Sequence, residues 1–118
     1  MSYELRPKSV YFNGAAAMDF TWTPGVDVMV HAVRLHLSGV PNDTNEDFRV
    51  DLDSAEDSKH DVNFVKRDLK DEEIQDLIVS FDLYEGFMKM GDGLKCSYDN
   101  SDPFNWGVEI VYENWTIE

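Results

Sequence analysis

Four segments between residues 48 and 113 carry apolar side chains at every second position. In the first of them, Phe48, Val50 and Leu52 are separated by charged residues, and the pattern returns over residues 77–84, 94–99 and 106–113. Successive side chains of a β-strand point to opposite faces of a sheet. Each segment is therefore predicted to be a strand with one face in a core and the other mostly in water.

Three further stretches are predicted to add strands. Residues 26–37 form the longest apolar segment, and the parity of its apolar residues drifts. This indicates a central strand covered on both sides, or a strand with a bulge that exchanges its faces. The Asn13-Gly14 pair, with a short apolar segment on either side, favours a two-residue type I′ hairpin. Residues 62–65 predict one more strand.

Together these signals give seven to eight short strands with turn residues between them. We expect residues 1–118 to form a single domain, an all-β, antiparallel β-sandwich of jelly-roll-like or immunoglobulin-like topology. Residues 70–75 are the one helical candidate, with Asp71 as the cap, and would supply at most one short helical turn. The 42% hydrophobic and 13% aromatic fractions provide the material for a core.

The charge of the chain is one-sided, with 24 acidic against 10 basic residues and a net charge of −14. Binding to nucleic acid needs clustered Lys and Arg, and only Lys66, Arg67 and Lys70 approach a cluster. We therefore expect no nucleic acid and no anionic membrane among the partners. The charge either keeps the protein soluble or suits docking onto a basic surface.

The sequence gives no sign of export or membrane insertion. The N-terminal residues lack the apolar core of a signal peptide. No apolar run approaches the roughly 20 residues that a membrane span needs. We expect a protein that is made and kept in a cytoplasm.

No arrangement of residues predicts catalysis. The motifs of nucleophile elbows, metal-binding helices and phosphate loops are absent. His31 and His36 are five residues apart, so a regular strand would direct them to opposite sides unless a bulge intervened. Cys96 shares the parity of Leu94 and Tyr98, which predicts a small buried side chain and not a reactive thiol. We expect a protein that is not an enzyme and uses no cofactor.

Acidic residues offer a metal-site hypothesis, with a second candidate at Asp99, Asn100 and Asp102, where Asx side chains more often build the turn itself. Asp51, Asp53 and Asp57 belong to the densest acidic stretch of the chain. Calcium is bound by six to eight oxygens, often from closely spaced Asp side chains in a loop. The stretch lacks the spacing and the central glycine of an EF-hand, so a solvated turn is the simpler interpretation.

Aromatic residues at segment ends are candidates for binding a partner. Trp22 and Trp115 would be either edges of the core or exposed anchors. Ile117 belongs with Trp115 to a short apolar C-terminal segment, which suits pairing with a sheet edge of this chain or of a neighbouring subunit.

Several short segments after Glu46 occur in an order that carries a family resemblance. They are Val50-Asp51-Leu52-Asp53-Ser54-Ala55, Asp61-Val62, Asp76-Leu77-Ile78-Val79, Met90-Gly91-Asp92 before Leu94, Tyr98-Asp99-Asn100-Ser101-Asp102, and Trp106-Gly107-Val108-Glu109-Ile110. In this order they resemble a family of small β-sandwich proteins that tailed bacteriophages encode as virion structural components. The insert at residues 71–75 and the extra methionines Met88 and Met90 have no assigned place in the resemblance.

The resemblance implies an assembly role and supplies no catalytic residues. It implies a bacteriophage virion structural protein: a capsid decoration or cement protein that binds the major capsid protein and stabilises the shell, or else a neck, tail or fibre-attachment accessory protein. The implied location is the virion, after synthesis in the host cytoplasm. Other virion proteins are the expected partners, and a homo-oligomer is expected, with a trimer matching the threefold points of a shell.

The residues leave a second function open. A carbohydrate-binding β-sandwich module, with or without calcium, would stack a sugar on Trp22 or Trp115 beside acidic loops.

Overall fold

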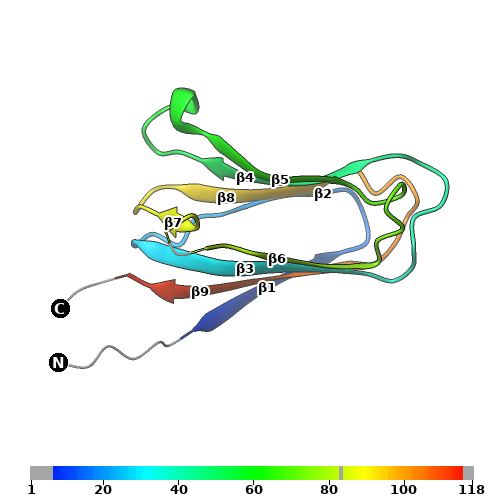
Figure 1. Ribbon diagram of the computed structural model, residues 1–118, viewed down its shortest axis with the longest axis horizontal. Coiled ribbons are helices and arrows are strands. Elements are labelled where there is room, and N and C mark those ends of the chain that lie inside the picture. Colours follow the sequence, from blue (N-terminus) through cyan, green and yellow to red (C-terminus); the bar gives the residue numbers. More distant parts are fainter. Residues whose placement is uncertain (1–6, 83, 116–118) are drawn as a thin grey trace.

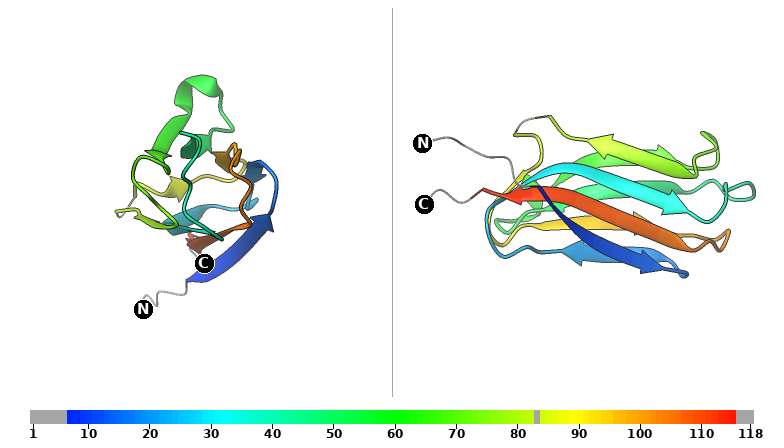
Figure 2. Two further views of the ribbon diagram at one scale, coloured as in Figure 1. Left: turned by 90° about the vertical axis from the view of Figure 1, so that its right-hand side faces the viewer. Right: turned by 90° about the horizontal axis from the view of Figure 1, so that it is seen from below.

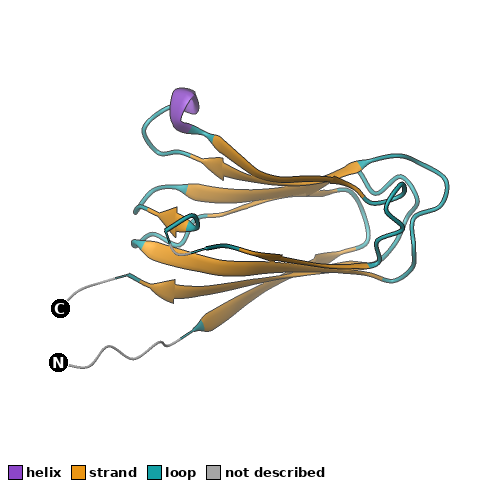
Figure 3. Ribbon diagram, viewed as in Figure 1, coloured by secondary structure: helices purple, strands orange, loops and turns teal. Residues whose placement is uncertain are grey.

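The computed structural model describes residues 7–82 and 84–115, and within these ranges the chain forms nine β-strands and one 3-10 turn (Figures 1 and 3). The strands are β1 Lys8–Gly14, β2 Met18–Trp22, β3 Val28–Leu37, β4 Asp47–Asp53, β5 Val62–Asp68, β6 Asp76–Ser80, β7 Phe87–Met88, β8 Gly93–Tyr98 and β9 Trp106–Asn114. The 3-10 turn η1 is Ser58–His60. The all-β prediction is confirmed, with one strand more than expected because the two residues of β7 are too few to show an alternation.

The strands form two antiparallel sheets that face each other (Figure 2). One sheet has the order β1-β9-β3-β6, with β7 paired to the start of β3, and the other has the order β2-β8-β4-β5. The chain therefore wraps four strand pairs in turn around one core: β1 with β9, β2 with β8, β3 with β6, and β4 with β5. This is the strand order of a double-sheet jelly roll, and the immunoglobulin-like alternative is excluded by it.

The core lies between the sheets and is built by the alternating segments. Phe48, Val50, Leu94 and Ile110 are fully buried, while the residue that follows each of them along its strand is more exposed. The predicted inward parity of β4, β8 and β9 is confirmed, whereas the strand predicted over residues 77–84 ends at Ser80. Cys96 is also fully buried, as predicted. Burial, with a smaller contribution from Asp51, raises the pKa of its thiol to about 12, so it is not a nucleophile near neutral pH.

The apolar segment 26–37 changes its inward face through a bulge. The pairing of β3 with β9 shifts register between Val30 and Ala32, so Val30 and Val33 are both buried although they differ in parity. The bulged residue is His31, whose side chain reaches Glu113 at 3.0 Å on the outer side of the sheet. His36 also lies on that outer side and contacts Asp76. The bulge therefore overturns the regular-strand expectation that His31 and His36 face opposite sides.

The predicted hairpin at Asn13-Gly14 is wrong. β1 and β2 follow each other along the chain but belong to different sheets, and Gly14 does not have a positive φ. Gly14 instead lies against the ring of Trp106, where an added Cβ would come within 2.7 Å of a ring carbon. The indole N–H of Trp106 donates to the carbonyl of Ala16 at 2.9 Å. This long-range contact overrides the local turn preference.

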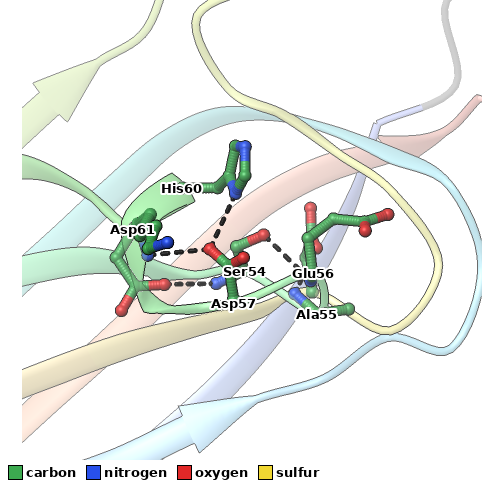
Figure 4. A network of polar contacts seen from close by, with 8 residues as sticks. Ser54, Ala55, Glu56, Asp57, His60 and Asp61 are labelled. Atoms are coloured by element: carbon green, nitrogen blue, oxygen red, sulfur yellow. Dashed lines mark hydrogen bonds and ion pairs between the residues drawn. The ribbon is translucent and has the colours of Figure 1, made fainter.

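The helical expectation for residues 70–75 is also wrong. Residues 69–73 form a turn, and the carboxylate that accepts its backbone N–H groups belongs to Asp68, not to Asp71. The one helical turn of the described residues is η1, in the acidic loop between β4 and β5 (Figure 4). There Asp57 accepts from the backbone N–H of Lys59 at 2.9 Å, as an N-cap does.

The loops at the two ends of the sandwich differ. We call the end with loops 15–17, 38–46, 69–75 and 99–105 the Asn100 end, which lies to the right in Figure 1. Asn100 is buried and joins two of these loops: its Nδ2 donates to the carbonyls of Ala16 (3.0 Å) and Phe104 (2.9 Å), and its Oδ1 accepts from the N–H of Phe104 at 3.0 Å. Its φ of 57° lies in the left-handed region that Asn tolerates.

Asp102 at the same end is expected to make stability depend on pH. Burial raises the pKa of the Asp102 carboxyl, but hydrogen bonds from the backbone N–H groups of Asp43 and Thr44 lower it by a larger amount. The pKa therefore lies below its ordinary value. A carboxyl whose pKa is lowered by folding contributes its full stabilisation at pH values above its pKa in the unfolded chain, which is about 3.9. This stabilisation is lost as the pH falls through the pKa of the folded state. Urea unfolding should therefore show a difference between wild type and Asp102→Asn that shrinks from pH 5 to pH 3. An NMR titration midpoint for Asp102 at or above its ordinary value would contradict this.

Tyr98 is expected to be replaceable by phenylalanine with a gain in stability. Its hydroxyl is buried, and no described residue makes a hydrogen bond with it. Burial, and then the carboxylates of Glu46 and Asp102, raise the pKa of Tyr98 to about 12. Removing an unsatisfied buried hydroxyl relieves its desolvation cost, so Tyr98→Phe should raise the free energy of unfolding by about 1 kcal/mol. Urea unfolding at pH 7 measures this, and a loss of stability would show that the hydroxyl is bonded.

Candidate functional site

The end opposite to Asn100 carries exposed apolar side chains. We call it the Trp115 end; it comprises loop residues 23–27, 54–61, 81–82, 84–86 and 89–92 together with the end of β9. Val26 is 42% exposed, Tyr84 65% and Met90 68%, and Trp115 is half-buried among them. These four residues are named the end cluster.

Backbone and ring contacts hold the end cluster together. The N–H of Trp115 donates to the carbonyl of Asp27 at 2.9 Å, and the carboxylate of Asp27 accepts from the N–H of Met90 at 2.7 Å. The ring of Tyr84 packs edge-on against that of Trp115, with centroids 6.3 Å apart. Val26, Met90 and Trp115 line a shallow hollow of about 250 Å³. Residues from three loops and the end of β9 thus form one apolar surface.

Two loop geometries fix Met90 and Tyr84 in exposed positions. Met90 precedes Gly91, whose φ of 96° requires glycine. The buried carboxylate of Asp92 closes this turn by accepting from Lys89 N–H at 3.0 Å and from Ala55 N–H at 2.9 Å. Tyr84 itself has a φ of 74°, an uncommon conformation for a bulky residue.

The surroundings of the end cluster are acidic. Asp27 lies beside Met90. Asp82 and Glu85 flank Tyr84 in one turn, where Glu85 accepts from the N–H of Asp82 at 2.7 Å. An apolar centre with an acidic rim suits a protein surface that offers an apolar contact among basic residues.

The predicted partner-binding residues Trp115 and Trp22 lie in different environments. Trp115 belongs to the end cluster. Trp22 is half-buried against the core, and its ring lies 4.7 Å from that of Tyr112, so it is an edge of the core. Ile117 lies outside the described residues. Val26, Tyr84 and Met90 were not predicted from the sequence. The Gly-Asp pair after Met90 could have indicated an exposed Met90, because such a turn exposes the residue before it.

The weak calcium candidates do not assemble into a site. Asp51 accepts from Arg49 at 3.3 Å and from Asn63 at 2.7 Å. Asp57 is engaged within its own loop by Lys59 N–H and His60 (Figure 4). Across residues 7–82 and 84–115, no three His, Cys, Asp or Glu side chains are placed to hold a metal ion. Side-chain and backbone N–H groups of the protein itself therefore occupy the carboxylates of Asp51 and Asp57, and Asp53 joins no such group of ligands among the described residues.

Comparisons of the chain with protein-family models, with curated proteins and with solved structures give no match. Among the described residues, no helix is long and apolar enough to cross a membrane.

Proposed function

We propose that this chain is a structural accessory protein of a bacteriophage virion, which docks as a decoration protein on the major capsid protein. The observation that carries the proposal is the end cluster: four apolar side chains, three of them well exposed, gathered on one end of the sandwich. Exposed contiguous apolar surface on a small protein is characteristic of a contact site. The segments between Val50 and Ile110 resemble phage virion proteins by their order along the sequence. This resemblance is the reason for proposing a virion protein as the partner.

The charge of the chain supports a protein partner with a basic surface. A net charge of −14 repels nucleic acid and speeds the approach to a positively charged shell. Many copies of the partner on one shell would raise the avidity of a small contact. The jelly-roll strand order occurs in viral capsid domains and also in lectins, so it agrees with the proposal by analogy alone.

The proposal is tested by co-sedimentation with empty capsids assembled from the major capsid protein of the genome that encodes the chain. The wild-type chain should sediment with capsids and saturate them. Val26→Asp and Met90→Asp, which place a charge in the end cluster, should each weaken binding at least about tenfold, as expected at the centre of a contact. Val62→Asp is the matched control, because Val62 on β5 is 45% exposed and lies outside the end cluster; it should bind as wild type does.

Two results would overturn the proposal. One is a wild-type chain that ignores capsids; parallel sedimentation with purified tails and necks would then decide whether it is an accessory protein of those parts. The other is equal loss of binding in Val26→Asp and Val62→Asp, which would remove the end cluster as the contact. Light scattering on the free chain tests the expected homotrimer.

A further inference from the structure

The outer face of the β1-β9-β3-β6 sheet has a hollow where β9 carries a glycine. Gly107 lies between Asn13 of β1 and His36 of β3, and His36 in turn lies opposite Asp76 of β6. A Cβ added at Gly107 would meet no atom within 4 Å. The hollow above it has a volume of about 530 Å³, which is within the range of small-molecule sites.

Two exposed apolar side chains stand in the next row of the sheet. Tyr11 on β1 is 69% exposed and Ile78 on β6 is 66% exposed, and both line the hollow. Glu109 and Arg34 occupy the positions between them. A ligand seated over Gly107 would therefore meet an aromatic ring on one side and an aliphatic side chain on the other.

The polar groups of the hollow are held in place by one another. Glu109 accepts hydrogen bonds from Ser9 Oγ at 2.7 Å, from Tyr11 Oη at 3.1 Å and from Arg34 Nη1 at 3.3 Å. The bond from Ser9 is the main cause that lowers the pKa of Glu109, so this side chain is a carboxylate at neutral pH. His36 contacts Asp76 at the opposite edge.

From this arrangement we infer that the hollow binds a neutral hexopyranose unit of a glycan. One face of a pyranose ring is apolar and stacks on an aromatic ring such as Tyr11. Its adjacent hydroxyls both donate and accept, and they match the planar carboxylate, guanidinium, imidazole and amide groups of Glu109, Arg34, His36 and Asn13. Glu109 and Asp76 outnumber the Arg34 cation, and the whole chain is acidic, so anionic sugars are disfavoured. This site is separate from Trp22 and from the end cluster.

The inference is tested by NMR titration of the ¹⁵N-labelled full chain with methyl α-D-glucopyranoside, methyl α-D-mannopyranoside, methyl β-D-galactopyranoside and N-acetylglucosamine. At least one of them should shift the amides of Gly107, Tyr11 and Arg34 in a saturable way, with a Kd of about 1 mM, as a ligand of this size allows. Glucuronate, in which a carboxylate replaces the hydroxymethyl group of glucose, should bind at least tenfold more weakly than the best of the four sugars.

Variants locate the binding. Gly107→Val fills the hollow without a clash at Cβ and should abolish the shifts while the urea midpoint stays at or above that of wild type. Tyr11→Ala should weaken binding at least tenfold. Tyr84→Ala removes a tyrosine of similar exposure at the Trp115 end and should leave the sugar shifts unchanged. The inference is overturned if none of the four sugars shifts these amides, if Gly107→Val binds as wild type does, or if glucuronate binds equally well.

Discussion

Asn100→Ala should lower the free energy of unfolding by about 3–4 kcal/mol, because two effects add. The side chain makes three hydrogen bonds to backbone groups of Ala16 and Phe104, each of them contributing about 1 kcal/mol. Alanine at a φ of 57° adds about 1 kcal/mol of backbone strain. Urea unfolding followed by tryptophan fluorescence measures the change.

Two companion variants separate these effects. Asn100→Gly removes the hydrogen bonds but accepts the left-handed backbone, so it should be less destabilising than Asn100→Ala. Asn105→Ala changes an exposed asparagine in the same loop, and its backbone N–H keeps the bond to Ser38; its stability should equal that of wild type. A loss below 1 kcal/mol for Asn100→Ala would show that this end of the sandwich does not depend on Asn100.

Gly86→Ala should destabilise the chain by at least about 3 kcal/mol, at the upper end of overpacking effects. A Cβ at Gly86 would lie 2.1 Å from the carbonyl oxygen of Val30. The same residues are joined by a hydrogen bond of 2.8 Å from Val30 N–H to the Gly86 carbonyl. The backbone at Gly86 lies directly against the backbone of Val30, beside the β3 bulge. Neither segment can therefore move away from the added methyl group without breaking this hydrogen bond.

Gly107→Ala is the matched control for Gly86→Ala. Both variants add one methyl group to a glycine without a positive φ, but the methyl group at Gly107 points into open space. Its free energy of unfolding should stay within about 0.5 kcal/mol of wild type or rise slightly, because alanine restricts the unfolded chain. Equal losses in both variants would mean that steric overlap at Gly86 is not the cause.

The sequence was most informative where burial of one face determines the structure. Phe48, Val50 and Leu94 alternate with polar residues because one face of each strand lies in the core. The parity drift in residues 26–37 indicated either a strand covered on both sides or a bulge, and β3 has a bulge. These signals are local along a strand, so they can be read without knowledge of the partner strand.

Features that depend on distant partners could not be predicted in this way. Asn13-Gly14 has the composition of a hairpin turn, but the ring of Trp106 occupies the space beside Gly14. The end cluster joins Val26 to Trp115 across the fold. The hollow over Gly107 depends on the register that sets Asn13 and His36 beside it. The alternation of side chains predicts that Gly107 lies on the outer face of a strand, but it does not identify the residues that lie beside Gly107 on the adjacent strands.

The pairing of β1 with β9 also has a consequence for how the chain folds during synthesis. Val10 lies opposite Ile110, and Met18 lies opposite Tyr98. Neither β1 nor β2 has a partner within its own sheet until the last strands have left the ribosome. Folding of the sandwich must therefore wait until β8 and β9 have been synthesised, and it should be slow, as for other proteins whose contacts join distant residues. Until then the unpaired strands β1 and β2 are prone to aggregate.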